Sequence, residues 1–297
     1  MRYISSEAIA NLNISPSTCV DWVREAFLMK NRCQLPPKIS LHPQGNDFFN
    51  TMPCMLPSEY HTFGCKVVSR IKGSFPALKS EMMLFDSLSG EMTALMNCDW
   101  ITAMRTGAVA ALAINTLRKS DAKIYSIVGL GVIGHAVLDC ILATNSDIVV
   151  RLMRYKDHAE KTIGQYSGYP NVAFEIADTM EHLVCDADVV ISCITDADGL
   201  LVPDINLFKP GVLVVPVHTR GFQNCDTVFD KVFADDEGHV KGFKYFSQFR
   251  EFGELGDVLS GRIAGRANDD ERILSYNIGL GLHDVLYGHK ILNLINV

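Results

Sequence analysis

Short apolar runs alternate with helical stretches between residues 121 and 236, and this alternation predicts a parallel sheet covered by helices. The runs are nearly continuous in Val and Ile, as expected for strands that are buried on both faces. The predicted strands span residues 124–128, 148–153, 172–176, 188–194, 212–217 and 232–234.

The first 98 residues follow a different pattern. A helix is predicted near residues 20–30, and strand-like stretches follow at residues 48–55, 63–71, 82–85 and 91–96. The turn at residues 86–90 joins the last two stretches as a hairpin. This part of the chain therefore predicts a second, mainly antiparallel domain.

Two helical segments complete the pattern. Residues 99–119 predict a helix that bridges the two domains, with Asp99 as its N-cap, and residues 269–295 predict a helix that returns to the first domain. The predicted fold class is therefore α/β, with a Rossmann-type doubly wound parallel sheet and a second, mainly antiparallel α+β domain. We expect the parallel domain to span residues 119–274 and the other to span residues 1–118, completed by about 275–297.

Three glycines stand where the first predicted parallel strand meets a helix, in the segment KIYSIVGLGVIGHAVLDC. Gly129 permits a tight turn, Gly131 lets the backbone approach a pyrophosphate, and Gly134 lets helix and strand pack closely. The helix N-terminus favours the phosphates. The spacing predicts dinucleotide binding, and the alternative is that the glycines only close a tight turn.

Composition narrows the class of protein. The 297 residues are 48% hydrophobic and carry a net charge of -7, so the chain can bury a sizeable core. No basic run is present, which argues against nucleic acid as a partner. Nine cysteines without C-x-x-C spacing predict free thiols and no metal site. Without an apolar run of membrane or signal-peptide length, we expect a soluble cytoplasmic protein with no membrane partner.

The residues after the second parallel strand bear on the cofactor. In a dinucleotide-binding unit this position carries a carboxylate for the ribose of NAD, or positive charge for the 2′-phosphate of NADP. Here Arg154 and Lys156 follow Met153, which favours NADP(H), with NAD(H) possible. The alternatives are that both are solvated loop charges, or that Asp157 takes the position of the carboxylate.

Two cations stand in apolar surroundings. Lys66 lies in the predicted strand FGCKVVSR, and a buried Lys must be paired or have its pKa lowered. Arg105 begins an uncharged stretch of the bridging helix, where its forked donors suit a carboxylate or phosphate. Both indicate an anion site that also moves a proton. The alternatives are a half-exposed Lys66 and a structural salt bridge for Arg105.

Two further residues follow strands at the edge where ligands bind parallel sheets. His218 follows the fifth strand and can exchange a proton near neutral pH, although a structural histidine is equally compatible. Thr195 follows the fourth strand and could hydrogen-bond ribose or nicotinamide.

Several segments together resemble the ornithine cyclodeaminase and mu-crystallin family. They are KVVSR, MLFDSLSGEMTALM, DWITAMRTGAVAALA, VGLGVIG, and GELGDVLSGRIAGR followed by IGLGLHDV. The resemblance implies a two-domain homodimer that exchanges hydride between NAD(P) and a small amino or imino acid. It also implies that the N-terminal domain binds substrate and forms the dimer.

The resemblance also assigns residues. Lys66 and Arg105 would hold the substrate carboxylate, with Lys38 where the family often has Arg. The predicted catalytic residues are Lys66 and His218, either of which could supply the proton; for His218 this follows from its place after the fifth strand and not from the resemblance. By matching position, Gly129, Gly131, Gly134, Arg154 and Thr195 would line the cofactor. The other residues that we expect to bind the cofactor are Arg105, Thr106, Val132, Ile133, Lys156, Cys193, Val217 and Asn277.

The segment VHTRGFQNCD departs from the family. His218 stands where cyclodeaminases place an Asp that handles the substrate amine, and Asn277 and Tyr276 replace residues that are commonly Ser and Lys. These departures favour an NADPH-dependent imino-acid reductase or amino-acid dehydrogenase. The alternatives are an ornithine cyclodeaminase, which releases ammonia and proline, and a non-catalytic protein that binds NADP and a carboxylate ligand.

Overall fold

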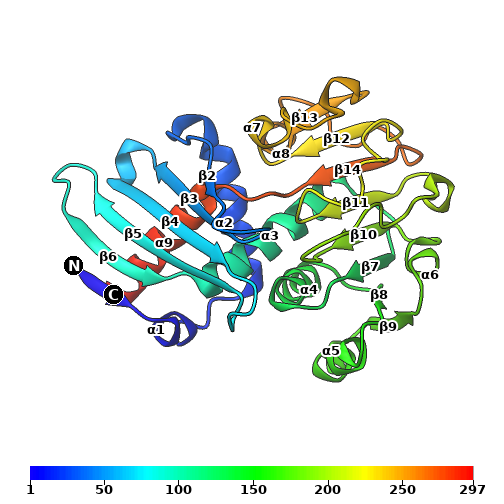
Figure 1. The fold of residues 1–297 in the computed structure, drawn as a ribbon, viewed down its shortest axis with the longest axis horizontal. Coiled ribbons are helices and arrows are strands. Elements are labelled where there is room, and N and C mark those ends of the chain that lie inside the picture. Colours follow the sequence, from blue (N-terminus) through cyan, green and yellow to red (C-terminus); the bar gives the residue numbers. More distant parts are fainter. Residues whose placement is uncertain (297) are drawn as a thin grey trace. The chain divides into compact units, whose positions relative to one another are not determined.

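An eight-stranded sheet, parallel throughout, is the frame of Thr106–Ile278, one of the two units into which the chain folds (Figure 1). The computed structural model describes residues 1–296. In chain order the strands are β7 (Ile124–Val128), β8 (Ile148–Met153), β9 (Val172–Ala177), β10 (Val189–Ser192), β11 (Leu213–Pro216), β12 (Lys231–Ala234), β13 (Phe252–Glu254) and β14 (Ile273–Tyr276).

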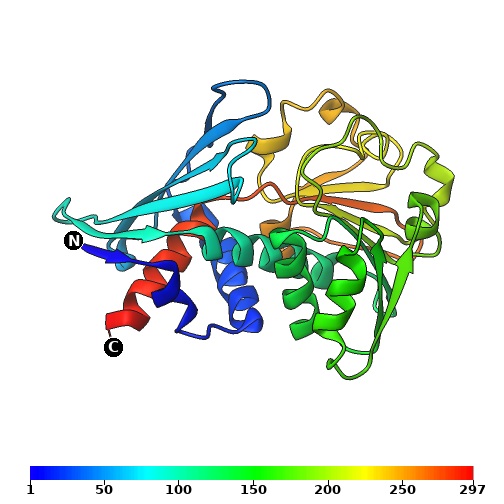
Figure 2. The same ribbon diagram turned by 60° about the horizontal axis from the view of Figure 1, so that its bottom comes forward.

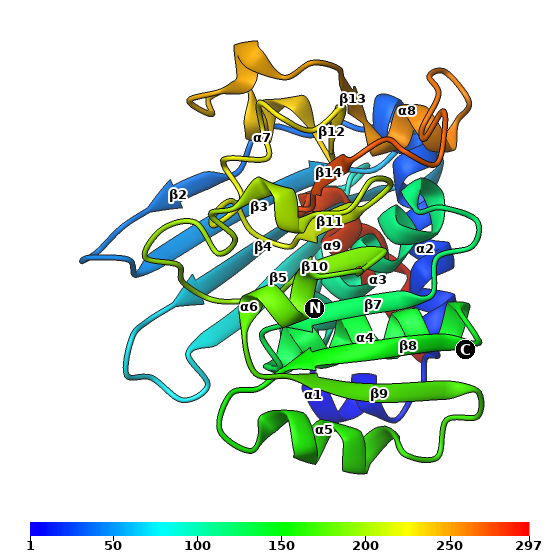
Figure 3. The same ribbon diagram turned by 90° about the vertical axis from the view of Figure 1, so that its right-hand side faces the viewer.

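Strand order in this sheet reverses beside β7. The order is β13-β12-β14-β11-β10-β7-β8-β9, so the chain moves outward through β8 and β9 and then returns to β10 on the other side of β7. Because crossovers between parallel strands are right-handed, this reversal places the helices before and after it on opposite faces of the sheet (Figure 3). The helices are α4 (Val132–Thr144), α5 (His158–Tyr166), α6 (Met180–Val184), α7 (Glu237–Val240) and α8 (Leu255–Leu259).

The other unit comprises Met1–Arg105 and the chain from Gly279 onward. Its six-stranded sheet has the order β1-β6-β5-β4-β3-β2, and only β1 runs parallel to its neighbour. The strands are β1 (Arg2–Ile4), β2 (Ile39–Leu41), β3 (Phe48–Met55), β4 (Thr62–Arg70), β5 (Leu78–Asp86) and β6 (Met92–Asn97). The two sheets confirm the predicted fold class.

Helices cover one face of the six-stranded sheet. The C-terminal helix α9 (Gly281–Asn296) packs on β3, β4 and β5, and α2 (Pro16–Met29) packs on α9. Figure 2 shows both helices, in red and blue, on the same side of the sheet. A short helix, α1 (Ser6–Ala10), follows β1. None of the helices in residues 1–296 is long and apolar enough to cross a membrane.

Helix α3 (Asp99–Leu117) begins in the first unit and ends in the second. Asp99, the predicted N-cap, is its first residue, one position after the N-cap, and its Oδ1 accepts hydrogen bonds from the N–H and hydroxyl of Ser80 on β5. Further along, a Cβ on Gly107 would lie 2.3 Å from the carbonyl oxygen of Ala136, so glycine allows α3 to pack against the backbone of α4.

One predicted element is wrong. The continuous helix expected over residues 269–295 begins only at Gly281, and Ile273–Tyr276 instead form β14 between β11 and β12. The strand is buried on both faces, so its apolar residues lack the alternation that identifies a strand. Gly279, with a positive φ of 95°, then separates the strand from the helix.

The core of the parallel unit contains an ionisable pair, which gives a testable prediction. Asp226 is buried and accepts a 2.7 Å hydrogen bond from the hydroxyl of Tyr276, and burial raises the pKa of Asp226 to about 6. A folded-state pKa above the unfolded value means that this carboxyl costs stability as the pH rises from about 4 to about 6. We expect Asp226→Asn to increase the free energy of unfolding by about 1–3 kcal/mol at pH 8 and to lose this gain near pH 4.

Urea unfolding at the two pH values measures the difference, and Asp198→Asn, at an exposed loop position, is the control. An Asp226→Asn effect that is the same at both pH values would contradict the prediction.

Candidate functional site

Lys66 lies in a row of methionines on the six-stranded sheet. The register places Met52 on β3 opposite Lys66 on β4, then Met82 on β5 and Met96 on β6, so the four side chains share one face. This methionine row is buried, and Lys66 is fully buried within it. A cation in such surroundings requires a specific partner.

The partner is Asp284 on α9. Its Oδ1 lies 2.7 Å from Nζ of Lys66 and 3.0 Å from Nε of Arg105 on α3. The hydroxyl of Thr102, one turn before Arg105, lies 3.4 Å from Nζ of Lys66. The three charged side chains, which we term the buried triad, comprise two cations and one anion. The triad therefore carries one net positive charge in an enclosed place, which favours an anionic ligand.

Burial sets the protonation of the triad. Burial, followed by the charge of Arg105, lowers the pKa of Lys66 to about 8, against the opposing effect of Asp284. For Asp284, burial acts to raise the pKa, but Arg105 and Lys66 together hold it below its ordinary value. Lys66 is therefore an ammonium at neutral pH with a pKa suited to giving up a proton.

Gly279 makes room for the arginine. A Cβ at this position would lie 2.1 Å from Nη1 of Arg105 and 3.1 Å from Nη2, so a larger residue would force the guanidinium out of this position. Asp284 binds Nε, which leaves the Nη1–Nη2 edge of the guanidinium outside this ion pair. That edge can bind a carboxylate through two parallel hydrogen bonds.

Lys38 lies one residue before β2. The register pairs Ile39 with Thr51, and continuing it by one residue sets Lys38 opposite Met52 of the methionine row. Lys38 thus follows the same row as Lys66, two strands away, and its side chain is half-buried.

In the parallel unit the three glycines occupy three different environments. Gly129 has a positive φ of 94°, and a Cβ on it would lie 2.6 Å from the backbone of Cys193. A Cβ on Gly134 would lie 2.1 Å from the carbonyl oxygen of Gly129. A Cβ on Gly131, by contrast, would meet nothing within 4 Å. Two glycines are thus required by the fold, and the space at Gly131 is open for a ligand.

The loop leads directly into α4, whose N-cap is Gly131 and has no side-chain cap. The first residue of the helix, Val132, is 73% exposed, which is unusual for valine. The next residue, Ile133, is half-buried. The uncapped N–H groups of this first turn provide donors for an anion such as a phosphate.

Backbone hydrogen bonds connect the ends of neighbouring strands along this edge. The N–H of Cys193 donates to Val128, that of Val217 to Ser192, and that of Asn277 to Pro216. The edge therefore gathers four predicted residues: Gly129, Cys193, Val217 and Asn277. Of these, Asn277 is buried, and its Oδ1 has no hydrogen-bond partner among the described residues. An unpaired buried acceptor suits a donor from a bound ligand.

His218 lies at the same edge but is held by its neighbours. Its Nδ1 accepts from the N–H of Arg220 at 3.2 Å, and its Nε2 lies 2.7 Å from the hydroxyl of Ser192. Burial, followed by the charge of Arg220, lowers the pKa of His218 to about 4. The ring is therefore neutral at pH 7, with no additional proton to give.

Arg154 and Lys156 follow β8 as predicted. Nε of Arg154 lies 2.5 Å from Asp178, and Nη1 pairs with Glu160 on α5. Lys156 is exposed, with a positive φ of 52°, and its ammonium lies 5.3 Å from the ring centroid of Tyr155. Thr195 is exposed in the loop after β10, and Thr106 lies buried on α3.

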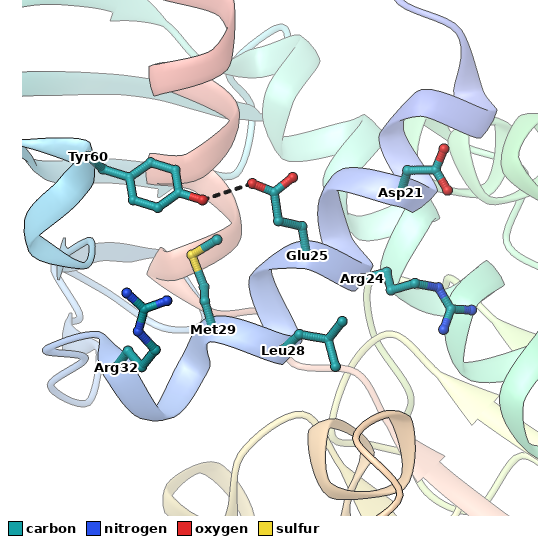
Figure 4. A pocket seen from close by; sticks show the side chains of 7 residues that line it. All are labelled: Asp21, Arg24, Glu25, Leu28, Met29, Arg32 and Tyr60. Atoms are coloured by element: carbon teal, nitrogen blue, oxygen red, sulfur yellow. Dashed lines mark hydrogen bonds between the residues drawn. The ribbon is translucent and has the colours of Figure 1, made fainter.

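A separate surface hollow lies along α2 (Figure 4). Glu25 there pairs with Lys290 at 2.8 Å and accepts from the hydroxyl of Tyr60 at 3.0 Å, and Arg32 pairs with Glu59. Because these pairs are at least partly exposed to solvent, the hollow lacks the buried excess charge of the triad. It is lined by Asp21, Arg24, Glu25, Leu28, Met29, Arg32 and Tyr60.

Sequence reasoning missed three residues of these sites: Asp284, Gly279 and Ser192. Asp284 could have been noticed as an acidic residue within the otherwise apolar start of α9. The predicted absence of a metal site stays a prediction, although residues 1–296 contain no group of three His, Cys, Asp or Glu side chains placed to hold a metal.

The doubly wound sheet and its glycine loop are those of nicotinamide-dinucleotide-dependent oxidoreductases. More narrowly, the chain belongs to the ornithine cyclodeaminase/mu-crystallin family, whose model matches residues 4–294.

Individual relatives match this chain over more than two thirds of its length. The nodulation efficiency protein NfeD of Rhizobium meliloti is 26% identical over 294 residues, which cover 95% of this chain and 89% of that protein. The Delta(1)-pyrroline-2-carboxylate reductase of Bacillus cereus is 28% identical over 221 residues, 69% of this chain and 67% of that protein. The solved structure of the Thermococcus litoralis Delta(1)-pyrroline-2-carboxylate reductase, in complex with NADH and L-proline, matches with a TM-score of 0.86. It is 21% identical, and the match covers 100% of this chain and 99% of that one.

Proposed function

We propose that this protein transfers hydride between a nicotinamide dinucleotide and a small amino or imino acid, at the carbon that bears both nitrogen and carboxylate. The observation that carries the proposal is the net positive charge of the buried triad of Lys66, Arg105 and Asp284. A substrate carboxylate would neutralise it. The similarity to Delta(1)-pyrroline-2-carboxylate reductase makes cyclic imino acids the first candidates.

The residues present fit the cofactor. The pyrophosphate would be held by Gly129, Gly131 and the first turn of α4. The buried Oδ1 of Asn277 would accept a hydrogen bond from a donor group of the cofactor. When bound, the dinucleotide supplies or accepts the hydride.

The chain's own residues bind the substrate and move the proton. Arg105 would hold the carboxylate, with Lys66 and Lys38 adding positive charge. Lys66 would also give the proton to the substrate nitrogen, since its pKa of about 8 lies near neutral pH. His218 was predicted to share this task. Its neutral state instead suits an orienting hydrogen bond.

Oxidation of NADPH and NADH in the presence of imino acids tests the proposal. Suitable substrates are Delta(1)-pyrroline-2-carboxylate, six-membered cyclic ketimine carboxylates, and pyruvate with ammonia. We expect turnover with at least one of them. Absence of turnover with all of them at high enzyme concentration would overturn the proposal, and proline formed from ornithine with catalytic NAD would establish the cyclodeaminase instead.

For the cofactor we propose a preference for NADP(H), because β8 ends at Met153 and is followed at once by Arg154, with no carboxylate at that point. Asp178 and Glu160 would orient Arg154 until a 2′-phosphate competes for it. We expect Arg154→Met to lower kcat/KM with NADPH by roughly 10–100-fold and with NADH by less than about 3-fold.

Steady-state kinetics with both cofactors measure this, and Lys161→Met, an exposed α5 residue paired with Asp157, is the control. Equal losses with NADPH and NADH would contradict the preference.

We also propose a cytoplasmic homodimer. All nine cysteines are free, as suits a reducing compartment. The face of the six-stranded sheet opposite α9 carries the half-buried side chains of Phe63, Cys65, Val67, Met83, Phe85 and Leu95. An apolar sheet face of this kind suits a second copy of the chain.

Sedimentation equilibrium should therefore give twice the mass of the chain, and Val67→Glu should shift the protein toward monomer. A monomeric wild-type protein at micromolar concentration would overturn the dimer.

A further inference from the structure

Asp284 holds two cations with a single oxygen atom. Both Nζ of Lys66 and Nε of Arg105 bind its Oδ1, while its Oδ2 has no hydrogen-bond partner among the described residues. Lys66 and Asp284 are fully buried, and the side chain of Arg105 is 8% exposed. Burying these three charges carries a large desolvation penalty. The carboxylate also does not use both of its oxygens on Arg105, as it would in a bidentate ion pair.

We propose that Asp284 is a positioning residue that keeps Lys66 protonated and aims the Nη1–Nη2 edge of Arg105 at the substrate carboxylate. This inference rests on the proposed function. Asp284 itself would not touch the substrate; it would act through the two cations.

Charge balance supports this role. Without a carboxylate, Lys66 and Arg105 would be two like charges in a buried place, and only Lys66 can relieve the repulsion by losing its proton. A neutral Lys66 would neither attract a carboxylate nor give a proton. Asp284 therefore decides whether the site is charged before substrate arrives.

The geometry of the ion pair between Asp284 and Arg105 also supports the positioning role of Asp284. Because Asp284 binds Arg105 through Nε, it fixes the plane of the guanidinium without using its outer edge. Gly279 provides the space in which that edge lies. An aspartate whose task was only to fasten α9 to the sheet would not require this combination.

The other ionisable groups around the triad are few. Cys98, before α3, acts on Lys66 through its charge if ionised, but burial raises the pKa of this thiol well above its ordinary value. His283 lies beside Asp284 on α9, and Cys54 on β3 also interacts with that carboxylate. A hydrogen bond with Cys33, followed by burial, raises the pKa of Cys54, so this thiol stays neutral near pH 7. Asp284 is thus the anion that opposes the two cations.

The test is Asp284→Asn, compared with Asp47→Asn. Asp47 is also buried in this unit but accepts the backbone N–H of Lys72 and belongs to no ion pair of the triad. Loss of the carboxylate lowers the pKa of Lys66, so the ammonium disappears at a lower pH. We expect the basic limb of the kcat/KM profile to move from about pH 8 to below about pH 7, with activity at pH 8 falling at least about 5-fold and activity at pH 6 retained within about 10-fold.

A second readout does not depend on turnover. Lysine Cε resonances in the substrate-free protein report the titration of Lys66 directly, assigned by loss of the signal in Lys66→Met. We expect the midpoint to fall in Asp284→Asn and to stay in place in Asp47→Asn. An unchanged midpoint, or a loss of activity that is the same at every pH, would overturn the inference.

Asp284→Glu shows whether the effects of Asp284→Asn result from loss of the charge or from a folding defect. It keeps the charge but moves it by one methylene, so we expect the Lys66 titration to be retained while KM for the imino acid rises at least about 10-fold. A Lys66 midpoint that falls as far in Asp284→Glu as in Asp284→Asn would overturn the inference. A titration shift without imino-acid turnover would uphold the electrostatic role of Asp284 while rejecting the proposed function.

Discussion

Lys66→Met is expected to reduce kcat/KM by about 10³-fold or more while leaving the folded protein at least as stable as before. The substitution removes the ammonium that we assign both to carboxylate binding and to proton transfer. It places a methionine between Met52 and Met82, where the neighbouring strands already present methionine side chains to α9. Asp284 keeps Arg105 as its partner, so no lone buried anion remains.

Steady-state kinetics and thermal unfolding, performed on the same preparation, separate these two effects. The control is Lys79→Met, which removes an exposed lysine from β5 of the same sheet and should change neither quantity. Turnover by Lys66→Met within about 10-fold of the wild type would remove Lys66 from the chemistry.

Gly131→Val is expected to weaken dinucleotide binding by about 100-fold, equivalent to about 2.7 kcal/mol, without lowering the melting temperature. Gly131 has φ of -90° and ψ of -165°, an extended conformation that valine adopts readily. The added side chain meets no protein atom near its Cβ, so it would occupy only the space into which a phosphate is expected to fit.

Calorimetric titration with NADPH measures the affinity. Gly164→Ala on α5 adds a methyl group that likewise meets nothing within 4 Å, but far along the chain from the glycine loop, and should leave affinity unchanged. Unaltered NADPH affinity in Gly131→Val would show that this loop does not bind the pyrophosphate.

Sequence reasoning predicted the strands of the parallel unit well where a continuous Val and Ile run lies between turn residues. The bounds predicted for β7 and β8 agree with the structure, because continuous Val and Ile runs between turn residues have few alternatives. The same reasoning predicts a helix over β14, since a four-residue strand buried on both faces has no periodicity of its own.

For the sites, sequence reasoning found the cations but not the anion between them. Lys66 and Arg105 are conspicuous because each interrupts an apolar segment. Asp284 lies 179 positions after Arg105, and nothing local indicates that the two side chains meet. The protonation of His218 was also beyond prediction, because it depends on burial and on the charge of Arg220.

The methionine row has an evolutionary consequence. A lysine-to-methionine substitution at position 66 would place a side chain there that matches the residues already beside it. A descendant of this protein could thus lose turnover in a single step while still folding and still holding a dinucleotide. Conversion of such an enzyme into a cofactor-dependent binding protein would require no intermediate that fails to fold.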